Sequence, residues 1–421
     1  MQHTSQTVEA KRVDSAPYWA ESEALRLAIV PVTPMNEIYL DNQATTPTDP
    51  RVVEAMLPML ATVAVGNPHS THSAGHRAAE IVDKARSSVA SLIGARSDEI
   101  VFTSGATEAN NIAIQGLARA IRSGRNRFVT CVTEHKCVLE AMSRIATLGF
   151  KVDAVNVAQD GLVDMSMLER AITDETALVS VMLVNNEVGV VQPISQIAAL
   201  CRERGAVLHT DAAQAVGKMV VDVKDLGVDL LSLSGHKLYA PIGIGALFVS
   251  QESRLRPEPL FAGGPQENGL RPGTVAPHLC AALGKACELA ESEMEADAKR
   301  LAFLADHFLA TICTRHPEVR VNGHRERRLK SNLSLTFPGI DADHLVGSLQ
   351  PRLALSTGAA CSAGFLQPSH VLLAMGLTAA DADSTVRVGF GRFNTTVEVE
   401  LAAELMSSKV TEIRMAAPYQ A

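Results

Sequence analysis

Residues 207–249 read VLHTDAAQAVGKMVVDVKDLGVDLLSLSGHKLYAPIGIGALFV and contain three short apolar runs. The runs are Val207–His209, Leu230–Leu233 and Gly245–Val249, and longer, more polar segments separate them. Short runs that are apolar on both faces are typical of strands in a mostly parallel sheet that helices cover. This stretch therefore predicts an α/β fold, in which ligands bind at the carboxyl ends of the strands.

The same alternation extends back to about residue 80. It adds four apolar runs, namely Ile100–Thr103, Phe128–Thr130, Val152–Val155 and Leu178–Val184. After about residue 275 the pattern changes, because residues 276–313 have the periodicity of an amphipathic helix, with an apolar face formed by Leu301, Leu304, Phe308 and Ile312. Strand-like segments follow at 333–335 and 386–388. We expect three parts: an N-terminal extension at 1–36, either a short helix or disordered, a large α/β domain at 37–276, and a small α+β domain at 277–421.

The composition narrows the class of protein. With 47% hydrophobic and 20% charged residues, the 421-residue chain has enough apolar material for a large core. A net charge of −8 and 4% aromatic residues argue against nucleic-acid binding. No apolar run is long enough to span a membrane. Seven cysteines without a CxxC pair, and an N-terminus without an apolar signal-peptide core, predict a cytoplasmic protein without disulfides.

Three segments carry residues suited to one kind of chemistry, although each also has an ordinary interpretation. In SGHK (234–237), Lys237 follows a strand and is suited to covalent chemistry on a carbonyl, unless it is a surface lysine. The segment SGATE (104–108) opens a helix, where backbone N–H groups favour a phosphate, unless a hydroxyl only caps the helix. Asp211 ends a strand, where a buried carboxylate needs a cationic partner, unless it is an N-cap.

The three segments together match the needs of pyridoxal 5'-phosphate. A lysine serves its aldehyde, a cradle of N–H groups its phosphate, and a carboxylate its ring nitrogen. The combination is therefore more informative than any one of its members.

Ten stretches, in order from about residue 38 to 395, resemble the cysteine desulfurases of the NifS/IscS type, within the class-V aminotransferase-like pyridoxal phosphate enzymes. They are YLDNQATTP (39–47), GNPHS (66–70), FTSGATEANNIAI (102–114), TEHK (133–136), VNNEVG (184–189), DAAQAVGK (211–218), SGHKLYAP (234–241), RPGT (271–274), STGAACSAG (356–364) and VRVGFGRF (386–393). The resemblance implies fold type I of the pyridoxal phosphate enzymes. This fold has a mostly parallel seven-stranded sheet in the large domain, and a smaller α+β domain that carries a catalytic cysteine loop.

The resemblance also implies roles for individual residues. Lys237 would bind the cofactor covalently, Cys361 would be the nucleophile, and His135 would stack on the cofactor ring and pass protons. Arg387, with Asn186, would bind the substrate carboxylate, for which a planar guanidinium is suited. The remaining cofactor contacts would come from Ala106, Thr107, Asn186, Asp211, Gln214, Ser234, His236 and Thr274. Thr274 would reach the phosphate of the neighbouring subunit, which implies a homodimer.

Cys361 also has a sequence context that suits a nucleophile. It lies in a run of small residues, which permits a mobile and exposed thiol that reacts as thiolate. The ordinary interpretation of any of the seven cysteines is a small buried hydrophobic residue. The activity implied is removal of sulfur from L-cysteine, which leaves L-alanine and a Cys361 persulfide.

The persulfide sulfur would pass to an acceptor protein or thiol, such as an iron–sulfur scaffold. Two alternatives stay open. One is another reaction on the same scaffold, by a selenocysteine lyase or an aminotransferase. The other is a sulfur-relay protein without catalysis.

Two further patterns are interpreted without a function. His69, His72 and His76 have a spacing that can bind a metal, but glycines and a proline interrupt the segment and no other ligand adjoins it, so no metal is predicted. The basic run at 325–330 is interpreted as a solvated loop.

Four positions depart from the family pattern, namely Ala240, Ile242, Pro265 and Pro272. None of them removes a proposed catalytic group. They affect the geometry of the loops that contain them.

Overall fold

The structure is a computed structural model, and it describes residues 37–61, 66–122, 124–357 and 368–416. The described residues from Ile38 onward belong to one compact unit. The N-terminal extension predicted at 1–36 and the predicted nucleophile Cys361 lie outside the described residues.

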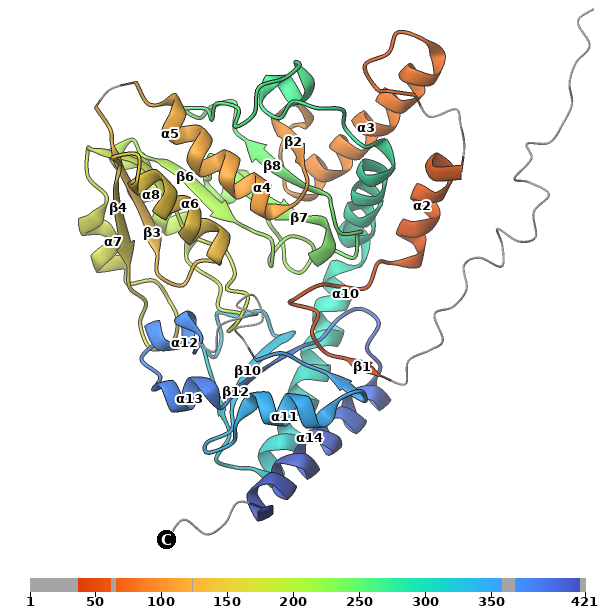
Figure 1. The fold of residues 1–421 in the computed structure, drawn as a ribbon, viewed down its shortest axis with the longest axis vertical. Coiled ribbons are helices and arrows are strands. Elements are labelled where there is room, and N and C mark those ends of the chain that lie inside the picture. The colour runs from red at the N-terminus through yellow and green to blue at the C-terminus, as the bar shows by residue number, and fades with distance from the viewer. Residues whose placement is uncertain (1–36, 62–65, 123, 358–367, 417–421) are drawn as a thin grey trace, which may run out of the picture. The chain divides into compact units, whose positions relative to one another are not determined.

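A seven-stranded sheet dominates the first part of this unit (Figure 1). Its strands lie in the order β2-β8-β7-β6-β5-β3-β4, and all neighbours pair in parallel except β8, which is antiparallel to β2 and β7. The predicted mostly parallel sheet of seven strands is therefore confirmed. The bounds are β2 (Ile100–Thr103), β3 (Arg127–Cys131), β4 (Lys151–Val155), β5 (Thr176–Ser180), β6 (Val207–Asp211), β7 (Leu230–Ser234) and β8 (Gly245–Val249).

One predicted strand has different bounds. The apolar run was expected to form a strand over Leu178–Val184, but β5 ends at Ser180. Beyond it, the Val181 and Leu183 N–H groups still donate to the backbone carbonyls of His209 and Asp211 in β6. Pairing with β3 ends at Ser180, and the Met182 N–H donates to the Glu134 carboxylate instead.

Helices pack on both faces of the sheet, and this explains the continuous apolar runs. In β3, Phe128 enters one hydrophobic core and its neighbour Val129 enters the core on the other face. The helices of this part are α2 (Pro50–Ala61), α3 (Ser73–Leu92), α4 (Ala106–Asn111), α5 (Leu117–Ala120), α6 (Lys136–Ala146), α7 (Met165–Ala171), α8 (Ile194–Arg204) and α9 (Val223–Leu226). A π-helical segment, Ile112–Gly116, joins α4 to α5, and short 3₁₀ turns lie at Ser97–Glu99, Gly235–Lys237 and Gln266–Gly269.

The long helix α10 (Pro277–Arg315) runs from the large sheet to two small sheets (Figure 1). One small sheet is antiparallel, with β9 (Arg320–Val321), β10 (Asn332–Thr336) and β12 (Thr385–Gly389), and the other pairs β1 (Ile38–Tyr39) in parallel with β11 (Leu353–Ala354). The remaining helices are α11 (Ala342–Leu349), α12 (His370–Ala374), α13 (Ala379–Asp383) and α14 (Thr396–Ala416). The predicted apolar face of α10 lies in the core of this region, through Leu301, Leu304, Phe308 and Ile312. The domain boundary near residue 276 stays a prediction.

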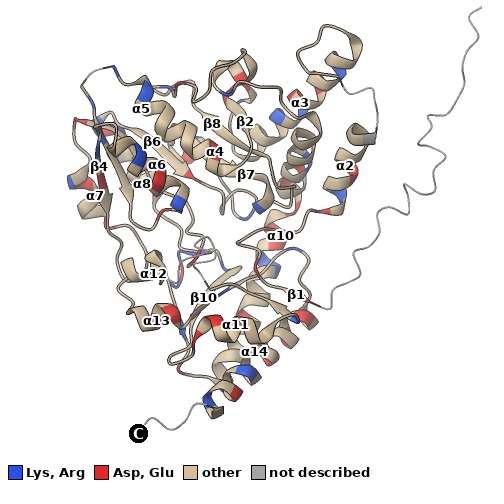
Figure 2. Ribbon diagram, viewed as in Figure 1, with Lys and Arg blue, Asp and Glu red and all other residues tan. Residues whose placement is uncertain are grey.

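Acidic and basic residues are interspersed along the same helices (Figure 2). Among the described residues, no helix is both long and apolar enough to cross a membrane. The six cysteines in the described part of the chain are free thiols.

Candidate active site

A cavity of about 380 Å³ lies at the carboxyl ends of β6 and β7, where ligands bind in open α/β sheets. Ten of the predicted site residues line it, namely Ala106, Thr107, His135, Asn186, Asp211, Gln214, Ser234, His236, Lys237 and Arg387. Larger cavities of about 520 and 560 Å³ lie elsewhere, at the start of β6 and beside α10, and neither is lined by Lys237. The fold thus brings together residues that lie up to 281 positions apart, from Ala106 to Arg387.

Lys237 lies on the 3₁₀ turn that follows β7. Its Nζ donates to the Ala44 carbonyl at 2.7 Å and also to the Gln43 carbonyl. The loop after β1 therefore fixes the amine at the wall of the cavity that Asp211 also lines.

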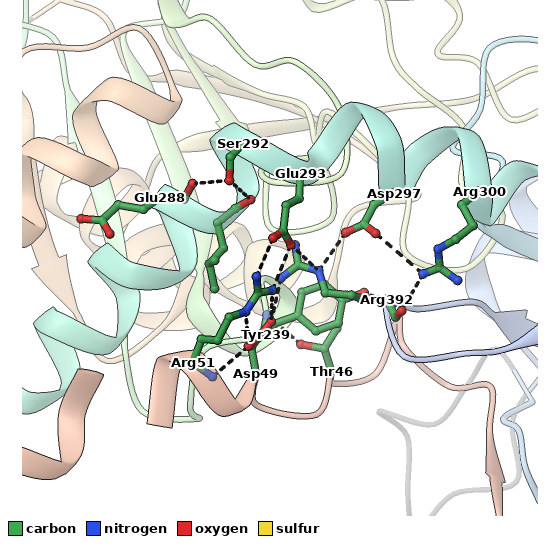
Figure 3. A network of polar contacts seen from close by, with 11 residues as sticks. Thr46, Asp49, Arg51, Tyr239, Glu288, Ser292, Glu293, Asp297, Arg300 and Arg392 are labelled. Carbon is green, nitrogen blue, oxygen red and sulfur yellow. Dashed lines mark hydrogen bonds and ion pairs between the residues drawn. The ribbon is translucent and has the colours of Figure 1, made fainter. Parts of the chain in front are cut away.

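A polar network holds the backbone just beyond Lys237 (Figure 3). Tyr239 has a φ of 62°, a strained value for a residue with a side chain. Its N–H donates to Thr46 Oγ1 at 2.9 Å, and its hydroxyl accepts from the Arg392 N–H at 2.6 Å. The Arg392 guanidinium lies 4.6 Å from the centre of the Tyr239 ring and pairs with Asp49 at 3.0 Å. These contacts stabilise the strained turn that orients Lys237.

The loop between β2 and α4 forms the predicted anion cradle. Gly105 is the N-cap residue of α4, has a φ of 149°, and supplies no side-chain cap to the helix. The backbone donors of the first helical turn, with Thr107, therefore border the cavity together with Ser234 from the end of β7. Burial, with the nearby charges of Lys237 and Lys218, lowers the pKa of His236 to about 4, so this imidazole is neutral at pH 7.

Asp211 ends β6 and is only 6% exposed. Its Oδ1 accepts from the Ala213 N–H at 2.9 Å, and its Oδ2 accepts from Asn110 Nδ2 at 2.7 Å. Among the described residues, no lysine, arginine or histidine forms an ion pair with it. The buried charge therefore fits a cationic ligand atom, such as a protonated ring nitrogen.

Arg387 reaches the cavity from β12, so the small sheet contributes to the site. Its Nη2 pairs with Asp41 at 2.8 Å, and its Nη1 donates to the Asn186 carbonyl at 3.1 Å. The buried Nε has no hydrogen-bond partner among the described residues. An unsatisfied guanidinium donor beside the cavity fits an anionic group such as a carboxylate.

Several polar residues of the site were missed by the sequence analysis. Asn110 positions Asp211, and Lys218 donates to Gln214 Oε1 at 2.8 Å, which leaves the Gln214 amide group to donate to the Gln43 carbonyl at 2.8 Å. Burial, with the charges of Lys237 and Arg387, lowers the pKa of Lys218 to about 7. Asn110 lies within the motif FTSGATEANNIAI and Lys218 within DAAQAVGK, so the motifs included both residues although no role was predicted for either.

Thr274 does not line this cavity but a neighbouring hollow, together with Phe261, Gly263 and Arg271. Cys361 lies outside the described residues. The roles predicted for both stay predictions.

The residues that line the cavity fit the chemical groups of pyridoxal phosphate. A lysine, a cradle of backbone donors and a buried carboxylate without a cationic partner line the same space, and Arg387 adds an unsatisfied donor. Together with the sheet topology, these residues define a pyridoxal-phosphate-dependent enzyme of fold type I.

Comparisons with known proteins agree with this class. Residues 38–401 match the family model described as aminotransferase class-V. The chain is 48% identical over 382 residues to "Cysteine desulfurase IscS" of Rickettsia massiliae (strain Mtu5), covering 90% of this chain and 93% of that protein. The chain belongs to the class-V aminotransferase family and, within it, to the cysteine desulfurases.

Comparison with solved structures supports the same family. A "NIFS-like protein" superimposes with a TM-score of 0.83 at 32% identity, covering 90% of this chain and 100% of that one. A structure described as "SspA in complex with cysteine" superimposes with a TM-score of 0.75 at 35% identity, covering 85% and 99%.

Proposed function

We propose that this protein removes sulfur from L-cysteine, leaving L-alanine and a persulfide on Cys361. The observation that carries the proposal is that Lys237, Asp211 and Arg387, whose Nε is an unsatisfied donor, line one cavity. Family membership and the cysteine-bound relative support the choice of substrate.

When bound, pyridoxal phosphate supplies an electron-withdrawing ring that makes the Cα proton of a bound amino acid acidic. The residues of this chain would do the rest. Lys237 Nζ would hold the cofactor covalently and would accept the Cα proton of the substrate. Asp211 would keep the ring nitrogen protonated, and His135 would contact the ring. The cradle at Ala106 and Thr107, with Ser234 and neutral His236, would bind the phosphate, while Gln214 and Asn186 would contact the ring hydroxyl side.

Arg387 would bind the substrate carboxylate through the donor that has no partner in the protein. The Cys361 thiolate would then attack the substrate sulfur, forming an S–S bond as the Cβ–S bond breaks. The electron pair of the broken bond, with a proton from the site, ends in alanine. Release of the persulfide sulfur as sulfide needs two electrons, which an acceptor thiol supplies.

The finer assignments rest on the family resemblance. We propose a homodimer in which Thr274 contacts the phosphate of the neighbouring site. The acceptor is a protein or small thiol, and an iron–sulfur scaffold is one candidate. The cytoplasmic location stays a prediction.

The test supplies the purified protein with pyridoxal phosphate, L-cysteine and a reducing thiol, and measures alanine and sulfide. We expect equimolar products from the wild type and no turnover from Lys237→Ala, which lacks the amine. We expect Cys361→Ser to bind the cofactor and to release no alanine, because a hydroxyl is hardly ionised near neutral pH. Cys313→Ser, which changes a thiol on α10, is the matched control and should keep full activity.

Other outcomes identify the alternatives. Alanine and sulfide at the wild-type rate from Cys361→Ser would contradict the proposal. Amino-group transfer to a keto acid without sulfide would indicate an aminotransferase. Turnover of selenocysteine but not of L-cysteine would indicate a selenocysteine lyase.

A further inference from the structure

Cys137 is a thiol in the wall of the main cavity that the sequence analysis gave no role. It lies in the first turn of α6, is half-buried, and lines the same space as His135 and Asp211. Its sulfur lies 3.0 Å from His135 Nδ1 and 3.2 Å from Asn110 Nδ2. The thiol therefore touches two residues on which the proposed cofactor site depends.

The direction of these hydrogen bonds follows from their partners. Asn110 Nδ2 lies 2.7 Å from Asp211 Oδ2. A carboxylate oxygen only accepts, so this end of the amide is the NH₂ group. The same NH₂ group donates to Cys137 Sγ, and the sulfur is therefore an acceptor there. The S–H proton donates to His135 Nδ1 provided that this nitrogen carries no proton of its own, a condition that the Cys137 backbone contact meets.

A second donor reaches the same ring nitrogen. The Cys137 backbone N–H donates to His135 Nδ1 at 3.2 Å, since the histidine side chain caps α6. Two donors at Nδ1 leave no place for a proton on that atom. The neutral ring then carries its proton on Nε2.

We propose that Cys137 is a positioning residue that fixes the orientation and tautomer of His135 and links it to the Asn110–Asp211 pair. One thiol would thus hold the residue that lies against the cofactor ring and the residue that pairs with the ring nitrogen. The proposal rests on the proposed function, because it takes His135 and Asp211 as cofactor contacts. It adds a residue that acts through both of them.

The experiment measures cofactor binding rather than turnover. Cofactor-free protein is titrated with pyridoxal phosphate, and the visible absorption band gives the affinity and the band position. Cys137→Ala should weaken the affinity about fivefold, the effect of losing one hydrogen bond, and should move the band. Cys137→Ser keeps a donor and an acceptor and should restore both readouts to within about twofold. Cys201→Ala, a buried thiol on α8, should match the wild type.

A double-mutant cycle tests whether Cys137 acts through His135. In a His135→Ala background, Cys137→Ala should change the affinity by clearly less than fivefold, because one of its two partners is already absent and only the contact with Asn110 remains. A full fivefold effect in that background would overturn the proposal. So would a Cys137→Ser variant that behaves like Cys137→Ala, since the thiol would then only fill space. Cys137→Val replaces Cys137→Ala if the latter does not fold, with the same expected losses.

Failure of the proposed function gives a different result. The wild type would then form no visible band, or Lys237→Ala would still form the covalent one. If the wild type binds the cofactor covalently through Lys237, then differences in affinity or band position among the Cys137 variants test the role of Cys137 alone.

Discussion

Asp211 is a buried carboxylate held by two neutral donors, the Ala213 N–H and the Asn110 amide. These hydrogen bonds orient the carboxylate, and neither of them comes from a cationic side chain. The arrangement favours a ligand with a protonated nitrogen at this position. The chemistry proposed for the site thus depends both on the two hydrogen bonds that Asp211 accepts and on the absence of a cationic side chain beside it among the described residues.

Replacing Asp211 with asparagine tests this reasoning. The carboxamide is nearly the same size but carries no charge, so the ring nitrogen should protonate less readily. We expect removal of the Cα proton to slow roughly a hundredfold or more, as when one main electrostatic contact of a transition state is lost. Deuterium exchange at Cα of the bound amino acid measures this step directly. Normal exchange with fully bound cofactor would mean that Asp211 only shapes the turn after β6.

Among individual residues, the sequence analysis predicted those that are charged and directly follow an apolar strand. Lys237 and Asp211 each follow a strand, and their motifs point to a pyridoxal phosphate site. Asn110 and Lys218 were not predicted, because their roles depend on the side chains that they contact in the folded chain, Asp211 and Gln214. Asn110 acts on a carboxylate 101 positions away, a contact that only the fold creates.

Elements were predictable where hydrophobic pattern and hydrogen bonding coincide. All seven apolar runs overlap a strand of the large sheet, and all of these strands except the edge strand β4 are almost wholly buried. Residues Val181–Val184 are also buried and still donate to β6, but their pairing with β3 has ended. An apolar pattern reports burial and not the ladder, so the end of that strand could not be predicted.

The turn after β7 depends on elements from both ends of the chain. Asp49 precedes α2, Glu293 and Asp297 lie on α10, and Arg392 follows β12, yet all join the network that supports Tyr239 (Figure 3). Asp49 is 1% exposed. Hydrogen bonds from Arg51, which outweigh the opposing effect of burial, and from Arg392 lower the pKa of Asp49 to about 2.

Asp49→Asn should therefore destabilise the protein. It removes a carboxylate shared by two guanidinium groups and leaves Arg392, whose side chain is 8% exposed, with fewer partners. The lowered pKa corresponds to a loss on the order of 2 kcal/mol at pH 7. The folded pKa lies below the unfolded value, so this contribution is full above about pH 4 and is lost as the pH falls toward about 2.

Thermal unfolding of the cofactor-free protein measures the difference between Asp49→Asn and the wild type across pH. Glu295→Gln, which removes an exposed partner of Lys299, is the control and should leave the midpoint unchanged. An Asp49→Asn midpoint equal to that of the wild type at pH 7 would show that the network does not stabilise the turn.

For the whole molecule, the site joins both regions of the compact unit, because Arg387 comes from β12 and Lys237 follows β7. Thr274 lies apart from this cavity within the chain, beside Phe261, which is 60% exposed. A residue predicted to bind phosphate but located outside its own site fits the proposed homodimer, in which it would complete the partner's site. The sequence contains both Lys237 and Thr274, but it does not show whether the two residues of one chain belong to the same site of a dimer.

Mixed dimers test the arrangement. Thr274→Ala should loosen the cofactor while leaving Lys237 unchanged. If sites are shared, a dimer of one Thr274→Ala chain and one Lys237→Ala chain has one site with both lesions and one with neither. Cofactor affinity and alanine production should then recover in about one site of two, which is measured on heterodimers purified through two different tags.

The matched control places both lesions on one chain and pairs it with a wild-type chain. With shared sites, the wild-type chain supplies Lys237 to a site that lacks Thr274, and the mutant chain supplies no lysine, so neither site is intact. If each site is instead built from a single chain, the control keeps one intact site and the first heterodimer has none. The two models therefore predict opposite results for the same pair of measurements, and recovery only in the control would contradict the shared site.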